Sequence, residues 1–100
     1  MSVESLRIHP AALEEAEAAV DWYAQRSERA AGMFLDELDH ANDRIGQNPE
    51  QHPPHDFGTR RIVLRRFPFV IVFRKAAAGV EIIAIAHGRR RPGYWRERLG

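Results

Sequence analysis

The stretch RRIVLRRFPFVIVFR, residues 60–74, decides the fold class of this chain. It is rich in Val, Ile and Phe, which favour β-strands, and Pro68 with its neighbours divides it into two strands expected over residues 60–66 and 69–75. The run FVIVF is apolar at successive positions, so both faces of its strand should be covered. We expect helices on one face, and a C-terminal segment or a partner chain on the other.

The residues on either side of this stretch complete a predicted meander. Val80 to His87 forms a third strand, and AAAG at residues 76–79 is short enough for the hairpin loop that precedes it. The polar stretch QHPPHDFG, residues 51–58, is expected to be a loop. The pattern therefore predicts a three-stranded antiparallel meander.

Two amphipathic helices are predicted before the meander. A short strand over residues 6–9 comes first, and Pro10 suits the first turn of a helix, where its missing N–H costs nothing. Ser27 is the expected N-cap of the second helix, which Gly46 and Pro49 end. Apolar residues recur at helical spacing: Leu13, Ala16, Val20 and Tyr23, then Ala31, Phe34, Leu35, Leu38, Ala41 and Ile45. We expect an antiparallel helical hairpin and an α+β fold, in which the N-terminal strand and the meander form one sheet and a basic C-terminal tail follows.

The composition indicates a single globular domain over residues 1–100. Hydrophobic residues make up 44% and charged residues 29%, and no segment approaches the roughly 18 consecutive apolar residues that a membrane span needs. The N-terminus lacks the pattern of a secretory signal, and the absence of cysteine excludes disulfides and thiolate chemistry. We therefore expect a soluble, cytoplasmic protein with no membrane association.

The net charge of +1 conceals a strong asymmetry between the two halves. Residues 1–50 hold eleven acidic and four basic residues, a balance of −7, whereas residues 51–100 hold three acidic and eleven basic residues, a balance of +8. Such an asymmetry favours a basic working face built by the second half. The alternative is that acidic helices and a basic sheet neutralise each other within the fold.

The tail HGRRRPGYWRERL, residues 87–99, combines five arginines with one tyrosine and one tryptophan. Such a segment can hold a phosphate backbone and stack on bases, or grip an acidic protein partner. His87 could serve as a general base or cap the sheet, and Tyr94 and Trp95 could stack on a partner or close the open side of the sheet. His52 and His55 form an HxxH pattern without a third nearby acid or cysteine of suitable geometry, so neither a metal nor a cofactor is predicted.

The sequence resembles the RelE/ParE superfamily of toxins from bacterial type II toxin-antitoxin modules. The resemblance covers nearly the whole chain, through RIHPAALEEAEAAVDWY, FLDELDHANDRIGQNPEQHP, RRIVLRRFPFVIVFR and, most specifically, IIAIAHGRRRPGYW, residues 82–95. It implies a toxin that an antitoxin neutralises by wrapping the sheet and helices. A homodimer or a toxin–antitoxin hetero-oligomer is the assembly expected.

The superfamily contains two activities, and the resemblance implies different residues for each. The RelE-like branch cleaves messenger RNA on the ribosome with basic residues and a tyrosine, and here Arg61, Arg90 and Tyr94 match that pattern, with His87 as a further catalytic candidate. Val63 and Val70 stand where this branch has a lysine and an arginine. A metal-free phosphoryl-transfer site depends on such cations, so the substitutions weigh against RNase activity.

The ParE-like branch, which poisons DNA gyrase and is not a nuclease, fits the acidic helical hairpin and the strand ending in AHGRR better. The expected target-binding or nucleic-acid-binding residues are Arg65, Arg89, Arg91, Trp95 and Arg96. The predicted function is therefore a growth-arresting toxin that acts on gyrase. The alternatives are a ribosome-dependent endoribonuclease, and a non-toxic or decayed nucleic-acid-binding module.

Overall fold

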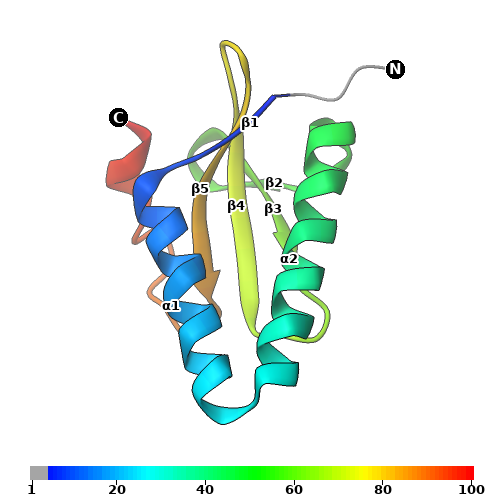
Figure 1. The fold of residues 1–100 in the computed structure, drawn as a ribbon. Coiled ribbons are helices and arrows are strands. Elements are labelled where there is room, and N and C mark those ends of the chain that lie inside the picture. Colours follow the sequence, from blue (N-terminus) through cyan, green and yellow to red (C-terminus); the bar gives the residue numbers. More distant parts are fainter. Residues whose placement is uncertain (1–4) are drawn as a thin grey trace.

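The computed structural model describes residues 5–100 as a mixed five-stranded sheet with two antiparallel helices on one face (Figure 1). The elements are β1 (Leu6–Ile8), α1 (Pro10–Arg26), α2 (Glu28–Gln47), β2 (Pro54–His55), β3 (Thr59–Val63), β4 (Phe69–Ala76) and β5 (Gly79–His87), with 3₁₀ turns at Pro49–Gln51, Asp56–Gly58 and Arg96–Leu99. The strand order is β1-β5-β4-β3-β2. This architecture confirms the predicted N-terminal strand, helical hairpin and meander.

The sheet differs from the predicted one in having an extra edge strand, β2, and in β3, which ends at Val63 rather than at Arg66 because the chain there turns toward β4. β1 runs parallel to β5, with Leu6 beside Val80 and Ile8 beside Ile82. β2 falls in the stretch predicted to be a loop, and its two residues pair antiparallel with the start of β3. A two-residue strand that begins with proline shows no alternation of polar and apolar residues, so the sequence pattern could not reveal it.

The helix boundaries agree with the capping signals in the sequence. Helix α1 starts at Pro10, and the side chain of the preceding residue, His9, accepts the Ala11 N–H at 3.0 Å. Ser27 separates the helices: its N–H donates to the Tyr23 carbonyl at 2.7 Å, and its Oγ accepts the Ala30 N–H at 3.1 Å. The predicted start at Pro10, cap at Ser27 and end near Gly46 and Pro49 are confirmed, since α2 ends at Gln47 and Gly46 is its buried next-to-last residue.

The fully buried residues of α1 are alanines, and Val20 and Tyr23 of the predicted stripe are partly buried against the same core. Ala12, Ala16 and Ala19 are buried, while Leu13 is 45% exposed. The predicted apolar stripe of α2 is confirmed except at Leu35, which is 42% exposed. Because alanine side chains are short, α1 lies close against β5, and this proximity lets other side chains of α1 reach the edge of the sheet.

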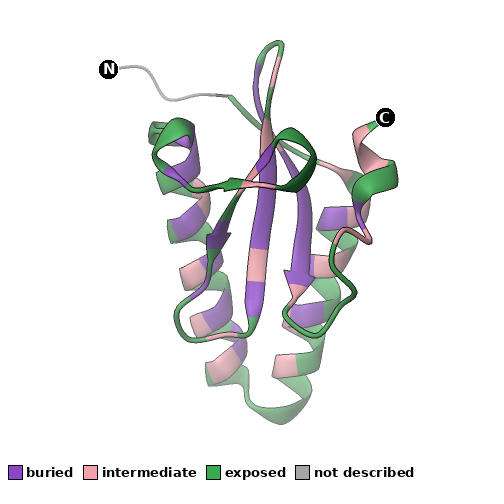
Figure 2. Cartoon of the chain, turned by 180° about the vertical axis from the view of Figure 1, so that it is seen from behind, coloured by how far each residue is buried: buried purple, intermediate pink, exposed green. Residues whose placement is uncertain are grey.

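The two central strands are buried on both faces, as the run FVIVF predicts (Figure 2). On the helix side, Phe34, Ile45, Ile71, Phe73 and Ile85 belong to the larger core. On the other side lies a smaller core of Val72, Ile83, Ala84, Ala86 and Trp95. A β-bulge between the pairs Val72–Ala84 and Phe73–Ile82 adds Ile83 to β5, so Ile83 and Ala84 both join the smaller core.

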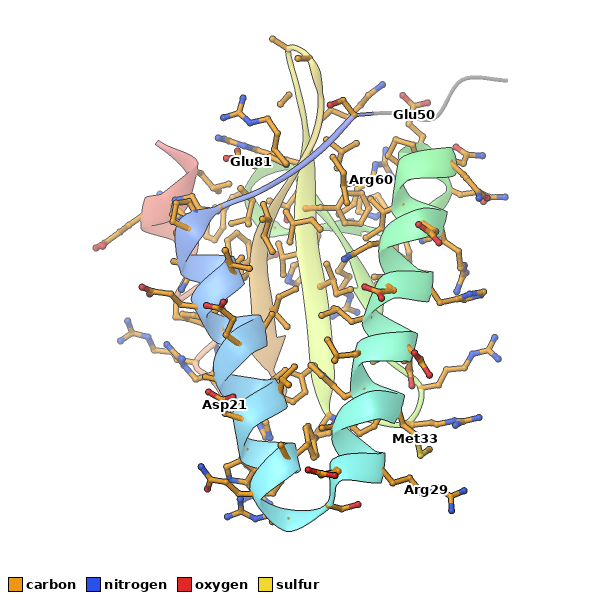
Figure 3. All side chains as sticks on the ribbon, viewed as in Figure 1. Asp21, Arg29, Met33, Glu50, Arg60 and Glu81 are labelled. Atoms are coloured by element: carbon orange, nitrogen blue, oxygen red, sulfur yellow. The ribbon has the colours of Figure 1, made fainter. Side chains whose placement is uncertain are left out.

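Residues 88–99, here called the C-terminal segment, run along the β5 side of the second face of the sheet and cover the smaller core (Figure 2). Trp95 is 2% exposed in the smaller core. Arg74 of β4 donates to the Leu99 carbonyl at 2.8 Å and pairs with Glu81 of β5, labelled in Figure 3, at 3.0 Å. The sequence left open whether a C-terminal segment or a partner chain packs on this face, and in the structure the C-terminal segment does so.

Candidate functional site

Two loops rich in arginine meet at the end of the sheet where β3 and β5 finish (Figure 1). Residues 64–68 connect β3 to β4, residues 88–92 follow β5, and the Gly88 N–H donates to the Pro68 carbonyl at 2.7 Å. These loops carry five exposed arginines, which we call the basic end: Arg65, Arg66, Arg89, Arg90 and Arg91. None of their guanidinium groups forms an ion pair with a carboxylate of residues 5–100, so their charge is available to an anionic partner.

Glu37 of α2 fixes the first of these loops. Its carboxylate accepts the backbone N–H of Arg65 and, at 3.3 Å, that of Arg66. Beside this contact a cavity of about 560 Å³ opens between α2 and β3, with Ile62 and Leu64 in its wall and Arg44 among its charged residues. The arginine side chains of the loop therefore project from a backbone that is tied to the helix layer.

The edge of β3 beside this cavity is open beyond its short pairing with β2. The Arg61 N–H donates outward to the Pro53 carbonyl at 3.1 Å, and the Leu64 N–H donates inward to the Phe69 carbonyl of β4 at 3.0 Å. Because backbone groups alternate along a strand, the N–H and C=O of Val63 point to the open edge. The pairing of β2 reaches only Arg60, so within residues 5–100 no strand meets Val63 on that side.

Glu15 of α1 is the centre of a polar cluster that joins the C-terminal segment to β5. Arg98 donates to its two carboxylate oxygens at 2.8 and 3.0 Å. The Tyr94 hydroxyl donates to one of these oxygens, and the Ile85 N–H donates to the other at 3.0 Å. Arg98 also donates to the Ile83 carbonyl at 3.0 Å, so one residue of the segment contacts both α1 and β5.

The cluster shifts the titration of its members. Burial disfavours the charged form of Glu15, but hydrogen bonds from Arg98, Tyr94 and Ile85 outweigh it and lower the pKa of this carboxyl below its ordinary value. Burial, followed by the hydrogen bond to Glu15, raises the pKa of Tyr94 well above that of a free phenol. At neutral pH the cluster is thus an ionised carboxylate held by a guanidinium and a protonated tyrosine.

Tyr94 connects this cluster to the basic end. The Arg90 guanidinium lies over the Tyr94 ring at 3.8 Å from its centroid, a cation–π contact. The Arg90 N–H donates to the His87 carbonyl at 2.9 Å. His87 accepts the Arg89 N–H on its Nδ1 at 3.0 Å and packs edge-on against Phe69, which is the capping arrangement considered from the sequence.

The residues that match the RelE-like pattern are not gathered into one charged cluster. On the second face of the sheet, Val63 pairs with Val70 and Val70 with Ala86, which gives an apolar row beside the basic end. Arg61 lies in the next row on the same face, opposite Val72 and two residues before Val63 in β3. The two positions where the RelE-like pattern has cations therefore form a cross-strand valine pair.

Trp95 and Arg96 do not lie at the basic end. The Trp95 ring packs against His55 and Phe57 at centroid distances of 5.8 and 5.9 Å, and the ring is buried, so it offers no surface to a target in this conformation. Arg96 lies over the Phe57 ring at 4.5 Å. Both residues join the C-terminal segment to the turn at Asp56–Gly58, and because Arg96 is exposed, its contact with a target stays a prediction.

No role for Glu15 or Arg98 was predicted from the sequence. Glu15 lies among several glutamates of α1, and only its position, three residues after Ala12 and four before Ala19, could have placed it on the buried face.

Within residues 5–100 no three His, Asp or Glu side chains are grouped to hold a metal ion. Over the same residues no helix is both long enough and apolar enough to cross a membrane.

Comparison with known proteins agrees with this geometry. A sequence model of the family described as "ParE toxin of type II toxin-antitoxin system, parDE" matches residues 6–92. No curated protein matches this chain. Among solved structures, one titled "Chromosomal ParDE TA system from P. aeruginosa" aligns with 85% of this chain and 96% of its own, with a TM-score of 0.74 and 22% identity, and therefore supports the fold alone.

The helical hairpin on a mixed sheet, together with the family match, defines a toxin of the RelE/ParE superfamily. Because the match spans most of the sequence, the chain belongs to the ParE toxin family of type II toxin-antitoxin systems. The matched part ends at Pro92, so Tyr94, Trp95 and Arg98 lie beyond it. The docking of residues 93–99 is thus a feature of this chain that the family match does not describe.

Proposed function

We propose that this ParE-family toxin arrests growth by poisoning DNA gyrase, and that it acts in the cytoplasm, where gyrase is found. The observation that carries the proposal is the basic end: five exposed arginines with no carboxylate partner among residues 5–100. The DNA that gyrase binds presents phosphates, and such groups attract an unneutralised cluster of guanidinium groups.

The valine pair supports a gyrase poison over a ribosome-dependent nuclease. Removing one preorganised donor from a catalytic site costs about 2.7–4 kcal/mol of transition-state stabilisation, and Val63 and Val70 replace two cations of the RelE-like pattern. Tyr94 is poorly suited to proton transfer, because its hydroxyl already donates to Glu15 and its pKa is raised. Arg61, Arg90 and His87 alone would leave such a site short of charge.

A ParDE system implies an antitoxin partner, and we propose that this partner adds a strand to the open edge of β3. The outward N–H and C=O of Val63 offer backbone hydrogen bonds, and the cavity between α2 and β3 can receive apolar side chains. Antiparallel pairing of two copies about Val63 would place Arg61 opposite Arg65 of the second copy, and like charges directly opposite are destabilising. An acidic segment of another protein suits this edge better.

Induction of the chain alone in bacteria tests the proposed target. We expect DNA synthesis to stop before protein synthesis, and purified protein to inhibit gyrase supercoiling and trap cleaved DNA. The variant R89Q/R91Q should lose at least about tenfold in potency, which equals about 1.4 kcal/mol. R7Q/R29Q removes the same charge from exposed arginines elsewhere and should retain potency.

Protein synthesis that stops first, with gyrase unaffected, would contradict the proposal and favour the nuclease alternative. Loss of potency in both double variants would show that overall charge matters rather than the basic end. Absence of any growth effect, with folded protein present, would favour the non-toxic or decayed alternative.

A further inference from the structure

We infer that Glu15 is a positioning residue, which docks the C-terminal segment against β5 and thereby orders Arg90 at the basic end. The inference rests on the proposed function in one respect, namely that the basic end contacts the target. Two of its residues, Tyr94 and Arg98, lie beyond the part that matches the ParE family, and it assigns a role to a helix residue, Glu15, that does not itself touch the target.

β1 covers only the first part of the outer edge of β5. β1 pairs only with Val80 to Ile82, and the His9 N–H donates to the Ile82 carbonyl at 2.9 Å as the chain turns into α1. Further along β5, no strand within residues 5–100 meets Ile83 or Ile85 on this side. Buried backbone groups need hydrogen-bond partners, so this part of the edge depends on side chains.

Glu15 and Arg98 together supply hydrogen-bond partners for the uncovered backbone groups of β5. Glu15 accepts the Ile85 N–H and Arg98 donates to the Ile83 carbonyl, both at 3.0 Å. The two side chains are joined at 2.8 Å and are only 15% and 17% exposed. A paired, hydrogen-bonded charge is tolerated in such a place, whereas either charge alone would be disfavoured. Loss of Glu15 would therefore release Arg98 as well as the edge of β5.

Tyr94 links Glu15 to the basic end. Tyr94 donates its hydroxyl to Glu15, which fixes the orientation of its ring, and Arg90 stacks on that ring at 3.8 Å. Arg90 is otherwise an exposed residue in a loop, and a long side chain of this kind loses much of its freedom only where it has a contact. Glu15 thus acts on Arg90 through Tyr94.

Amide hydrogen exchange of the full-length protein tests the inference in the variant E15Q. The amide keeps the size of the carboxylate but loses the charge that pairs with Arg98. We expect exchange at the Arg90, Arg96 and Arg98 amides to accelerate at least about tenfold, or about 1.4 kcal/mol of opening free energy. The Leu64 amide, bonded to Phe69 in the β3–β4 ladder, should accelerate by no more than corresponds to the loss of unfolding free energy that E15Q causes. A larger acceleration at the three arginine amides therefore reports local release of the C-terminal segment.

E17Q is the matched control, because Glu17 is an exposed glutamate on the same helix. It should exchange like the wild type. If E15Q does not yield folded protein, R98Q breaks the same ion pair from the other side and the same rates are compared. Unchanged exchange at Arg96 and Arg98 in the folded variant overturns the inference.

Gyrase inhibition by E15Q supplies the second readout, with an expected loss of at least about tenfold in potency. Faster exchange at Arg96 and Arg98 with unchanged exchange at Arg90 and unchanged potency would show docking without positioning, and would overturn the inference. If the wild type itself does not inhibit gyrase, the proposed function fails. The Arg90 amide then decides the inference alone, since its exchange is measured without any target.

Discussion

Glu15 shows how one carboxylate can make stability depend on pH. Its pKa is lowered in the folded protein, so the unfolded chain binds a proton at a higher pH than the folded chain does. The contribution of Glu15 to the free energy of unfolding is therefore fully present above its ordinary pKa and is lost as the pH falls through the lower, native pKa. Tyr94 and Arg98 are its partners over this range.

We predict that E15Q lowers the free energy of unfolding near neutral pH and that its effect shrinks in acid. Urea unfolding of both proteins from about pH 7 to about pH 3 should give a difference that is constant above the ordinary glutamate pKa and declines below it. E17Q, which makes the same change at an exposed site, provides the comparison. A difference that stays constant down to about pH 3 would show that the charge of Glu15 is not what stabilises the cluster.

Among the helices and strands, the sequence predicts those that follow a periodic pattern. It does not predict the features that depend on contacts between residues distant in sequence. The helices and the three long strands follow from periodicity, and the boundaries at Pro10 and Ser27 follow from local capping. β2 depends on the edge of β3 that it joins, and the role of Glu15 depends on a segment about 80 residues away in sequence. The basic end was visible as composition, but the meeting of its two loops required the pairing of Phe69 with His87.

The open edge of β3 gives a prediction for this element. Val63 donates no ladder hydrogen bond to β4, so V63P removes only the N–H that a partner strand would use, and proline is tolerated on strand edges. We expect V63P to fold and to bind the cognate antitoxin at least about tenfold more weakly by calorimetry. I62P is the contrasting variant, because the Ile62 N–H faces β4, and it should be strongly destabilised.

Wild-type affinity in a folded V63P protein would rule out strand addition at this edge and would direct the search to another surface. One such surface is the cavity of about 400 Å³ beside α1, lined in part by Trp22, Tyr23 and Phe69. W22A would then be the variant to compare, since Trp22 is half exposed and its loss should disturb the fold little.

Across the whole molecule, the two signs of charge lie in different places. Seven acidic residues are exposed on α1 and α2, as Asp21 is in Figure 3, whereas the basic end lies beyond the end of the sheet. Within residues 5–100, ion pairs join a few of these groups, such as Glu50 with Lys75 at 2.9 Å, and involve none of the five arginines of the basic end. The idea that acidic helices simply neutralise a basic sheet therefore does not account for the basic end.

This separation predicts that the two partners respond differently to salt. Binding to gyrase–DNA through the basic end should weaken steeply between about 0.05 M and about 0.2 M salt, because guanidinium–phosphate contacts release counterions. Antitoxin binding at β3 relies more on backbone pairing and apolar burial, so its dissociation constant should change less. Interferometry with immobilised toxin can measure both, and R89Q/R91Q should flatten the gyrase slope and leave the antitoxin slope unchanged. Equal slopes for the two partners, or a gyrase slope that the double variant does not alter, would contradict a working surface at the basic end.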